Sequence, residues 1–174
     1  LEQVISTVDS ALLMCGIVVA AEYFGGEVAR LGNEILDGAE WSAFAASAER
    51  TPSVAPGAMG FISLGYKVEN VMEPAEKHTG TLLPYLWLDS GCEHRLVTFL
   101  AASTKDPAKG VPAETYYRLR RQPGWAERRG EDGSVVERTN VVWFPYSGAL
   151  FVNTFSHLFL NYAAAGADEP AKFG

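Results

Sequence analysis

Apolar positions recur with helical spacing near the start of the chain. An apolar run covers residues 11–21, and residues 27–37 follow it after a glycine pair at 25–26. The second segment has one apolar stripe, formed by Val28, Leu31, Ile35 and Leu36. Spacings of three and four place such positions on one side of a helix, and a glycine pair is typical of a helix end. The pattern predicts an antiparallel helical hairpin whose first helix is buried on most of its circumference.

A serine followed three residues later by an acidic residue precedes two of the apolar runs. Ser6 and Asp9 stand before the first helix, and Ser90 and Glu93 stand before the apolar residues of 94–102. In a capping box the serine hydroxyl accepts a hydrogen bond from the first helical turn, and the acidic side chain reaches back to the backbone N–H of the serine. The signal predicts a helix start at each place.

The remaining segments predict loops, a hairpin and a last helix. Residues 50–88 are rich in Pro, Gly and polar residues and predict a long loop, with a loop or small β-hairpin up to residue 66. The turn residues at 130–134 and the run at 135–144 predict a β-hairpin. Aromatic and aliphatic residues at helical spacing predict a last helix over 149–165.

Composition and charge exclude several classes of partner. The chain has 174 residues, of which 48% are hydrophobic, and a formal net charge of -7, as expected of one globular domain. The negative charge disfavours a nucleic-acid partner. The apolar run at 11–21 is shorter than the roughly 18 residues that cross a bilayer, so no membrane span is predicted. Cys15 and Cys92 have no companion ligands, and neither a metal nor a cofactor is expected.

Four segments carry a family resemblance, and they occur in the family's order along the chain. They are residues 6–13 (STVDSALL), 60–66 (GFISLGY), 92–103 (CEHRLVTFLAAS) and 148–157 (GALFVNTFSH). Together they resemble the bacterial glucoamylase-like domain, an (α/α)6 glycoside hydrolase family that includes β-1,2-glucanases. Helix pairs separated by long loops suit such an α/α toroid. The expected fold is therefore mainly α, a partial α/α toroid with long loops and a small β-hairpin.

The resemblance also implies how much of the domain is present. Residues 1–174 are expected to be a single partial domain, an internal fragment of about half the toroid, since the family's downstream Asp-Gly-Pro-like motif has no counterpart here. Gly91 and Cys92 replace an aromatic residue and a Ser or Asn of the family pattern, and Asn161 replaces an acidic residue. Of the polar set in the last motif, Ser156 and His157 are kept. These departures imply a divergent specificity.

Glu93 is the candidate catalytic residue. Glycoside hydrolysis needs one carboxylic acid that protonates the departing oxygen and one carboxylate that activates water or attacks the sugar. The resemblance implies that Glu93 is the acid and that the base lies outside this sequence, so the isolated chain is expected to be inactive. The alternative is that Glu93 only closes a capping box with Ser90, where the helix N-terminus would lower its pKa and make it a poorer acid. Both interpretations stay open from the sequence.

Other residues near these motifs are candidates for contacts with a sugar, because aromatic rings stack on pyranose faces and polar groups bind hydroxyls. Each of them can equally be a cap or a core residue. The candidate substrate-binding residues are Asp9, Tyr66, Trp87, Asp89, Ser156 and His157.

The expected function is hydrolysis of β-1,2-glucan or a related β-glucan, by endo or exo action, with an oligo- or polysaccharide as partner. The resemblance implies a periplasmic or extracellular location. One alternative is a non-catalytic carbohydrate-binding or scaffold α/α domain, and another is a toroid lyase using Tyr146 and His157.

Overall fold

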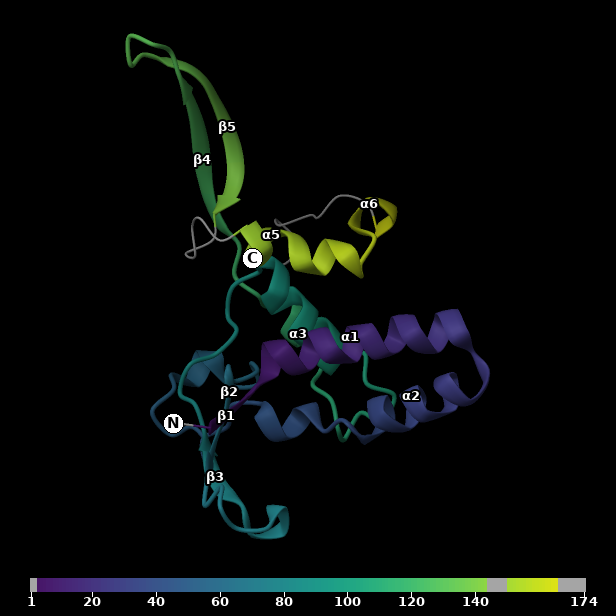
Figure 1. Cartoon of the computed structure of the whole chain (residues 1–174). Coiled ribbons are helices and arrows are strands. Elements are labelled where there is room, and N and C mark those ends of the chain that lie inside the picture. Colours follow the sequence, from purple (N-terminus) through teal and green to yellow (C-terminus); the bar gives the residue numbers. More distant parts are fainter. Residues whose placement is uncertain (1–2, 144–149, 166–174) are drawn as a thin grey trace.

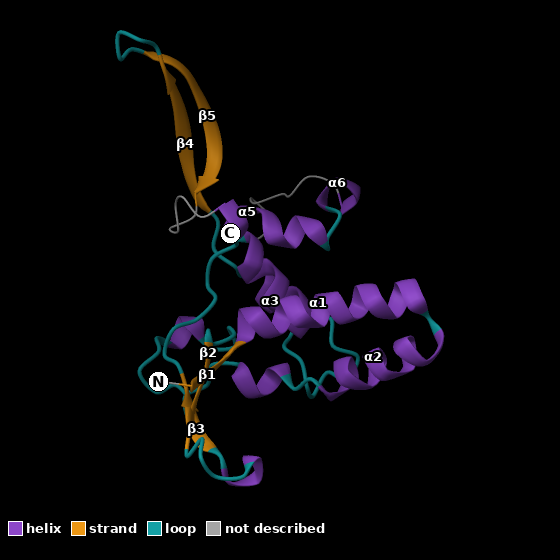
Figure 2. Cartoon of the chain, viewed as in Figure 1, coloured by secondary structure: helices purple, strands orange, loops and turns teal. Residues whose placement is uncertain are grey.

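The structure is a computed structural model, and it describes residues 3–143 and 150–165 (Figure 1). These residues form a mixed α+β fold with two small antiparallel sheets beside the helices (Figure 2). The prediction of a mainly α, partial α/α toroid is therefore wrong. Tyr146, a candidate in the lyase alternative, lies outside the described residues.

The elements have the following bounds. The helices are α1 (Thr7–Phe24), α2 (Gly26–Gly38), α3 (Cys92–Ala102), α4 (Glu114–Tyr117), α5 (Leu150–Thr154) and α6 (Tyr162–Ala165), with 3-10 turns that include η1 (Trp41–Phe44) and η4 (Phe155–Leu158). The strands are β1 (Gln3–Ser6), β2 (Gly65–Glu69), β3 (Thr79–Leu82), β4 (Gln122–Arg129) and β5 (Val135–Trp143).

The helical hairpin of α1 and α2 is confirmed. Gly25 and Gly26 make the turn with φ values of 63° and 51°, a region that side chains disfavour. The two helices approach closely at Gly32, where an added Cβ would lie 3.2 Å from Ile17 and from Ala21. The hairpin is therefore fixed by glycine at its turn and at its helix contact.

The prediction that the first helix is buried on most of its circumference is wrong. The buried residues of α1 are Thr7, Ala11, Cys15 and Ala21, and its other side chains are exposed or half-buried. Among the described residues, α1 is the one helix whose length and composition would let it cross a membrane, although a buried core helix can pass the same test. The absence of a membrane span therefore stays a prediction.

The first sheet has the order β1-β2-β3, and its strands come from distant parts of the chain. Tyr66 in β2 pairs with Ile5 on one side and with Leu82 on the other. The segment 50–88, for which a long loop is predicted, thus contains β2 and β3. This sheet is a main reason why the fold is not mainly α.

The second sheet is the hairpin β4-β5, which projects from the rest of the molecule (Figure 2). It confirms the hairpin that the turn residues at 130–134 predict. The predicted continuous last helix is wrong within its described part, because the chain forms α5, η4 and α6 in succession.

The core lies where α1 and α3 pack on each other and on the segment around η1. Val97 of α3 and Ala11 of α1 have no exposed surface. The cluster of buried residues consists of Ala11, Trp41, Ala45, Ile62, Trp87, Val97, Ala101 and Val111. This packing fixes the position of the first turn of α3, which carries Glu93.

Candidate active site

Glu93 lies in the first turn of α3, but it is not part of a capping box. The residue that precedes the helix is Gly91, and no side chain caps this helix start within the described residues. The backbone N–H of Ser90, which a capping glutamate would need, donates instead to the carbonyl oxygen of Arg120 at 2.9 Å. The cap interpretation of Ser90 and Glu93 is therefore wrong, and the Glu93 carboxyl group is free of that task.

The surroundings of Glu93 favour its protonated form. Glu93 is 9% exposed. Burial raises its pKa above the usual value for a glutamate, and the negative charge of Asp9 raises the pKa further. Asp9 lies in the first turn of α1, where its backbone N–H donates to the hydroxyl oxygen of Ser6 at 3.3 Å. Glu93 thus holds its proton to a higher pH than an exposed glutamate, as a general acid must.

Trp87 is a core residue and not an open platform for a sugar ring. Its side chain is 7% exposed, and its indole N–H donates to the hydroxyl oxygen of Thr7 at 2.8 Å. The Trp87 ring also packs on the ring of His94, with centroids 4.5 Å apart. Trp87 therefore ties the segment that leads into α3 to the first residue of α1.

His94 follows Glu93 in the sequence and is also buried. Its Nδ1 lies 2.9 Å from the carbonyl oxygen of Asp89. Burial lowers the pKa of His94, although Asp89 opposes this effect. The lowered pKa favours the neutral form of the His94 imidazole at pH 7.

Asp89 forms an ion pair with Arg120. Its two carboxylate oxygens accept hydrogen bonds from Nε of Arg120 at 3.1 Å and from a terminal guanidinium nitrogen of the same residue at 3.2 Å. Asp89 is 8% exposed. A buried carboxylate in a two-point ion pair orients the chain before α3, and it is not available to a sugar hydroxyl in this arrangement.

Tyr66 lies in β2, the central strand of the three-stranded sheet. An added Cβ on Gly80 of β3 would lie 2.7 Å from the Tyr66 ring, so the ring covers this glycine. Tyr66 is half-buried in β2. The structure therefore assigns Tyr66 to sheet packing.

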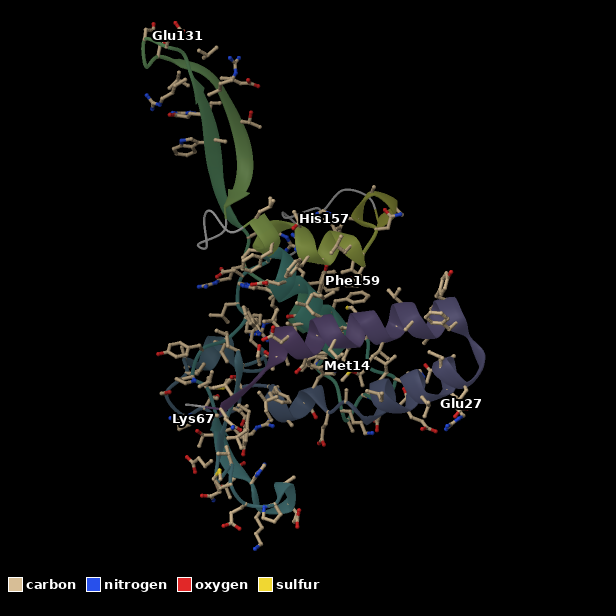
Figure 3. All side chains as sticks on the ribbon, in the orientation of Figure 1. Met14, Glu27, Lys67, Glu131, His157 and Phe159 are labelled. Carbon is tan, nitrogen blue, oxygen red and sulfur yellow. The ribbon has the colours of Figure 1, made fainter. Side chains whose placement is uncertain are left out.

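Ser156 and His157 form a separate cluster with Tyr162. Ser156 is fully buried, and its hydroxyl oxygen accepts a hydrogen bond from the Tyr162 hydroxyl at 2.7 Å. His157, labelled in Figure 3, is exposed, and its ring lies edge to face with the Tyr162 ring, with the two centroids 4.8 Å apart. This cluster reaches α3 through Arg95, whose guanidinium lies 5.5 Å from the centre of the Tyr162 ring.

The structure thus brings one candidate pair together, Glu93 and Asp9, and adds residues that the sequence did not single out. His94 and Arg120 are the main additions. His94 packs on Trp87. Arg120 binds the Asp89 carboxylate through its guanidinium and accepts the hydrogen bond of the Ser90 N–H at its carbonyl oxygen. No sequence pattern links Arg120 to the distant segment 89–90, so only the tertiary structure could reveal it.

The described cavities lie elsewhere. One of about 320 Å³ is bounded by α1, α2 and the C-terminal end of α3, with Met14, Trp41 and Phe99 in its walls. Of these residues, Met14 is labelled in Figure 3. Glu93 does not line this cavity. Within residues 3–143 and 150–165, no group of His, Cys, Asp and Glu side chains could hold a metal ion.

Comparisons of the chain with family models, with curated proteins and with solved structures found no match. The resemblance to the glucoamylase-like domain therefore stays a prediction.

Proposed function

We propose that this chain supplies the general acid, Glu93, of a glycoside hydrolase that acts on β-1,2-glucan or a related β-glucan. The observation that carries the proposal is that Glu93, in the first turn of α3, is buried and makes no capping hydrogen bond within the described residues. Burial and the negative charge of Asp9 both raise the pKa of Glu93. The substrate class rests on the resemblance of four sequence motifs.

The proposed chemistry assigns one step to this chain. Glu93 transfers its proton to the glycosidic oxygen as the bond between that oxygen and the anomeric carbon breaks. A water molecule adds to the anomeric carbon, and its proton goes to a second carboxylate that we place outside these 174 residues. Asp9 is exposed, and its role is to favour the protonated form of Glu93.

The test is the substitution Glu93→Gln in the full-length protein. Loss of a general acid lowers turnover about 10²–10⁴-fold, so kcat on β-1,2-glucan should fall in that range. Glu114→Gln is the matched control, because Glu114 is an exposed glutamate in the first turn of α4. If Glu93→Gln turns over the glucan as fast as Glu114→Gln does, Glu93 is not the acid.

The isolated chain offers a second test. Because the base is placed outside it, the 174-residue chain should release no oligosaccharides from β-1,2-glucan. Release that Glu93→Gln abolishes would keep Glu93 as the acid but place the base within this chain.

A non-catalytic carbohydrate-binding or scaffold domain is the second candidate. The observation that favours the scaffold form of this alternative is that Trp87, Asp89 and Ser156 are used in internal contacts. In that case the full-length protein should not hydrolyse the glucan. Glucan binding, if present, would then be the same in the wild type and in the Glu93→Gln variant.

A further inference from the structure

The helical hairpin of α1 and α2 exposes large apolar side chains on the side away from α3. We name this the outer hairpin face and define it by five residues that are between 43% and 68% exposed. They are Leu13 and Phe24 of α1 and Val28, Leu31 and Ile35 of α2.

Helix geometry places these five residues on one side of the hairpin. Ile17 and Ala21 of α1 meet Gly32 of α2, which marks the line of contact between the two helices. On the α3 side of this line, Met14 of α1 and Leu36 of α2 line the cavity described above. At about 100° per residue, the members of the outer hairpin face lie across the contact line from those cavity residues. The face is therefore one continuous surface that spans both helices.

An apolar surface of this kind is unusual for a helix pair that faces water. Scattered exposed apolar residues are normal, but a contiguous patch across two helices marks an interaction site. Two antiparallel helices with apolar side chains along their shared groove present the geometry that a third helix packs into. The shape of the surface thus favours a helical partner.

The charges beside the outer hairpin face indicate which charge the partner should carry. Glu27 and Glu34 lie four and three positions from Leu31 in α2, so they border the apolar stripe, and Arg30 lies between them. Arg30 forms ion pairs with both glutamates, which leaves this edge with one net negative charge. No Lys or Arg occurs in α1, so basic groups on the partner meet no repulsion from this helix.

We propose that the outer hairpin face binds an amphipathic helix whose apolar stripe is flanked by Lys or Arg residues. This site is separate from Glu93 and would add a helical protein partner to the proposed glucan chemistry. A second copy of the chain would bring the same acidic edge to the contact, and an anionic membrane would be repelled by it. The charge therefore selects the basic helix among apolar partners.

The test uses a fluorescent synthetic peptide of about 18 residues, with Leu and Ala on one face and Lys on both flanks. Its control is the same peptide with Glu in place of Lys. The chain should bind the Lys peptide saturably and about tenfold or more tightly than the Glu peptide, and added salt should reduce that preference. Fluorescence anisotropy measures both affinities.

Variants of the face localise the binding. Leu31→Ser combined with Ile35→Ser should weaken binding of the Lys peptide about tenfold or more, because it removes two central apolar contacts. Val135→Ser combined with Val136→Ser is the matched control, since these side chains are 44% and 52% exposed on the β4-β5 hairpin. Circular dichroism should show both variants folded. Glu27→Gln with Glu34→Gln leaves the apolar stripe intact and should reduce the preference for Lys over Glu.

Three results would overturn the proposal. The first is equal binding of the Lys and Glu peptides, and the second is equal binding by the two serine variants. The third is that the Lys peptide does not bind, while sedimentation shows a dimer or flotation shows binding to phosphatidylcholine vesicles. In that case the serine substitutions at Leu31 and Ile35 should abolish the dimer or the vesicle binding. That outcome would assign the face to a second copy of the chain or to a neutral membrane.

Discussion

The first turns of α1 and α3 are built differently, although each contains an acidic residue three positions after a serine. At α1 the hydroxyl oxygen of Ser6 accepts a hydrogen bond from the backbone N–H of Asp9 at 3.3 Å. At α3 the N–H of Ser90 donates to the carbonyl oxygen of Arg120, and the buried Ser90 hydroxyl has no hydrogen-bond partner among the residues that the structure describes. The start of α1 has a cap from its own sequence in addition to its tertiary contacts, and the start of α3 has tertiary contacts in place of a cap.

Burial accounts for the difference. Ser6 is the last residue of the exposed strand β1, where it pairs with Gly65 of β2, and next to it the exposed Asp9 forms the local hydrogen bond of the cap. Ser90 is 1% exposed, and the segment before α3 is held by Trp87 and by the ion pair of Asp89 with Arg120. A buried helix start follows its tertiary contacts, and this frees Glu93 for proton transfer.

The largest expected effect comes from breaking the link between the two helix starts. Trp87→Ala removes a buried indole and its hydrogen bond to Thr7, and should lower the free energy of unfolding by about 3–5 kcal/mol. Trp87→Phe keeps most of the ring and should cost about 1 kcal/mol, because the Thr7 hydroxyl still donates to the carbonyl oxygen of Ser63 at 2.7 Å. Urea denaturation measures both values. A loss below 1 kcal/mol for Trp87→Ala would show that Trp87 does not join the two helices.

The two serines should respond in opposite ways to the same substitution. Ser6→Ala removes a cap and should cost about 1 kcal/mol. Ser90→Ala removes a buried hydroxyl without a partner and should be neutral or stabilising. The measurement is again the free energy of unfolding in urea. Equal losses at the two positions would mean that Ser90 caps α3 in solution.

Stability as a function of pH sharpens the comparison further. The pKa of Glu93 is raised in the folded state, so the folded chain holds this proton more tightly than the unfolded chain does. The stabilisation that protonated Glu93 contributes is therefore fully present below the ordinary glutamate pKa of about 4.3. It is lost as the pH rises through the folded-state pKa. Glu93→Gln should remove this fall and leave the chain as stable as the wild type, or more stable, at pH 7. A clear loss of stability at pH 7 would indicate that the carboxylate has a structural role.

The elements that the sequence predicts correctly are those with local signals. Gly25 and Gly26 lie between two contiguous apolar segments, and the turn at 130–134 joins two contiguous strands, so each hairpin can be read without the rest of the chain. The sheet β1-β2-β3 was not predicted because its strands are short and Ile5 pairs with the distant Tyr66. That unrecognised sheet is a large part of why the expected toroid is wrong.

The candidate site divides in the same way. The serine and acid spacing locates Glu93 at a helix start, and this part is confirmed. Its burial depends on tertiary packing around the start of α3, where Trp87 and Arg120 belong to segments that no local pattern connects. The same packing accounts for Asp89, whose carboxylate pairs with Arg120.

The smallest expected effect concerns the charge of Asp9, which acts on Glu93 from the other helix start. Asp9→Asn removes a negative charge that raises the pKa of Glu93, so that pKa should fall, while burial should still hold it above the usual value for a glutamate. A carbon-detected NMR titration of the side-chain carboxyl groups measures the change directly. Glu22→Gln, at the opposite end of α1, is the control and should leave the Glu93 titration unchanged. If the Glu93 pKa is the same in the Asp9→Asn variant and in the wild type, the two first turns are electrostatically independent, and burial alone makes Glu93 an acid.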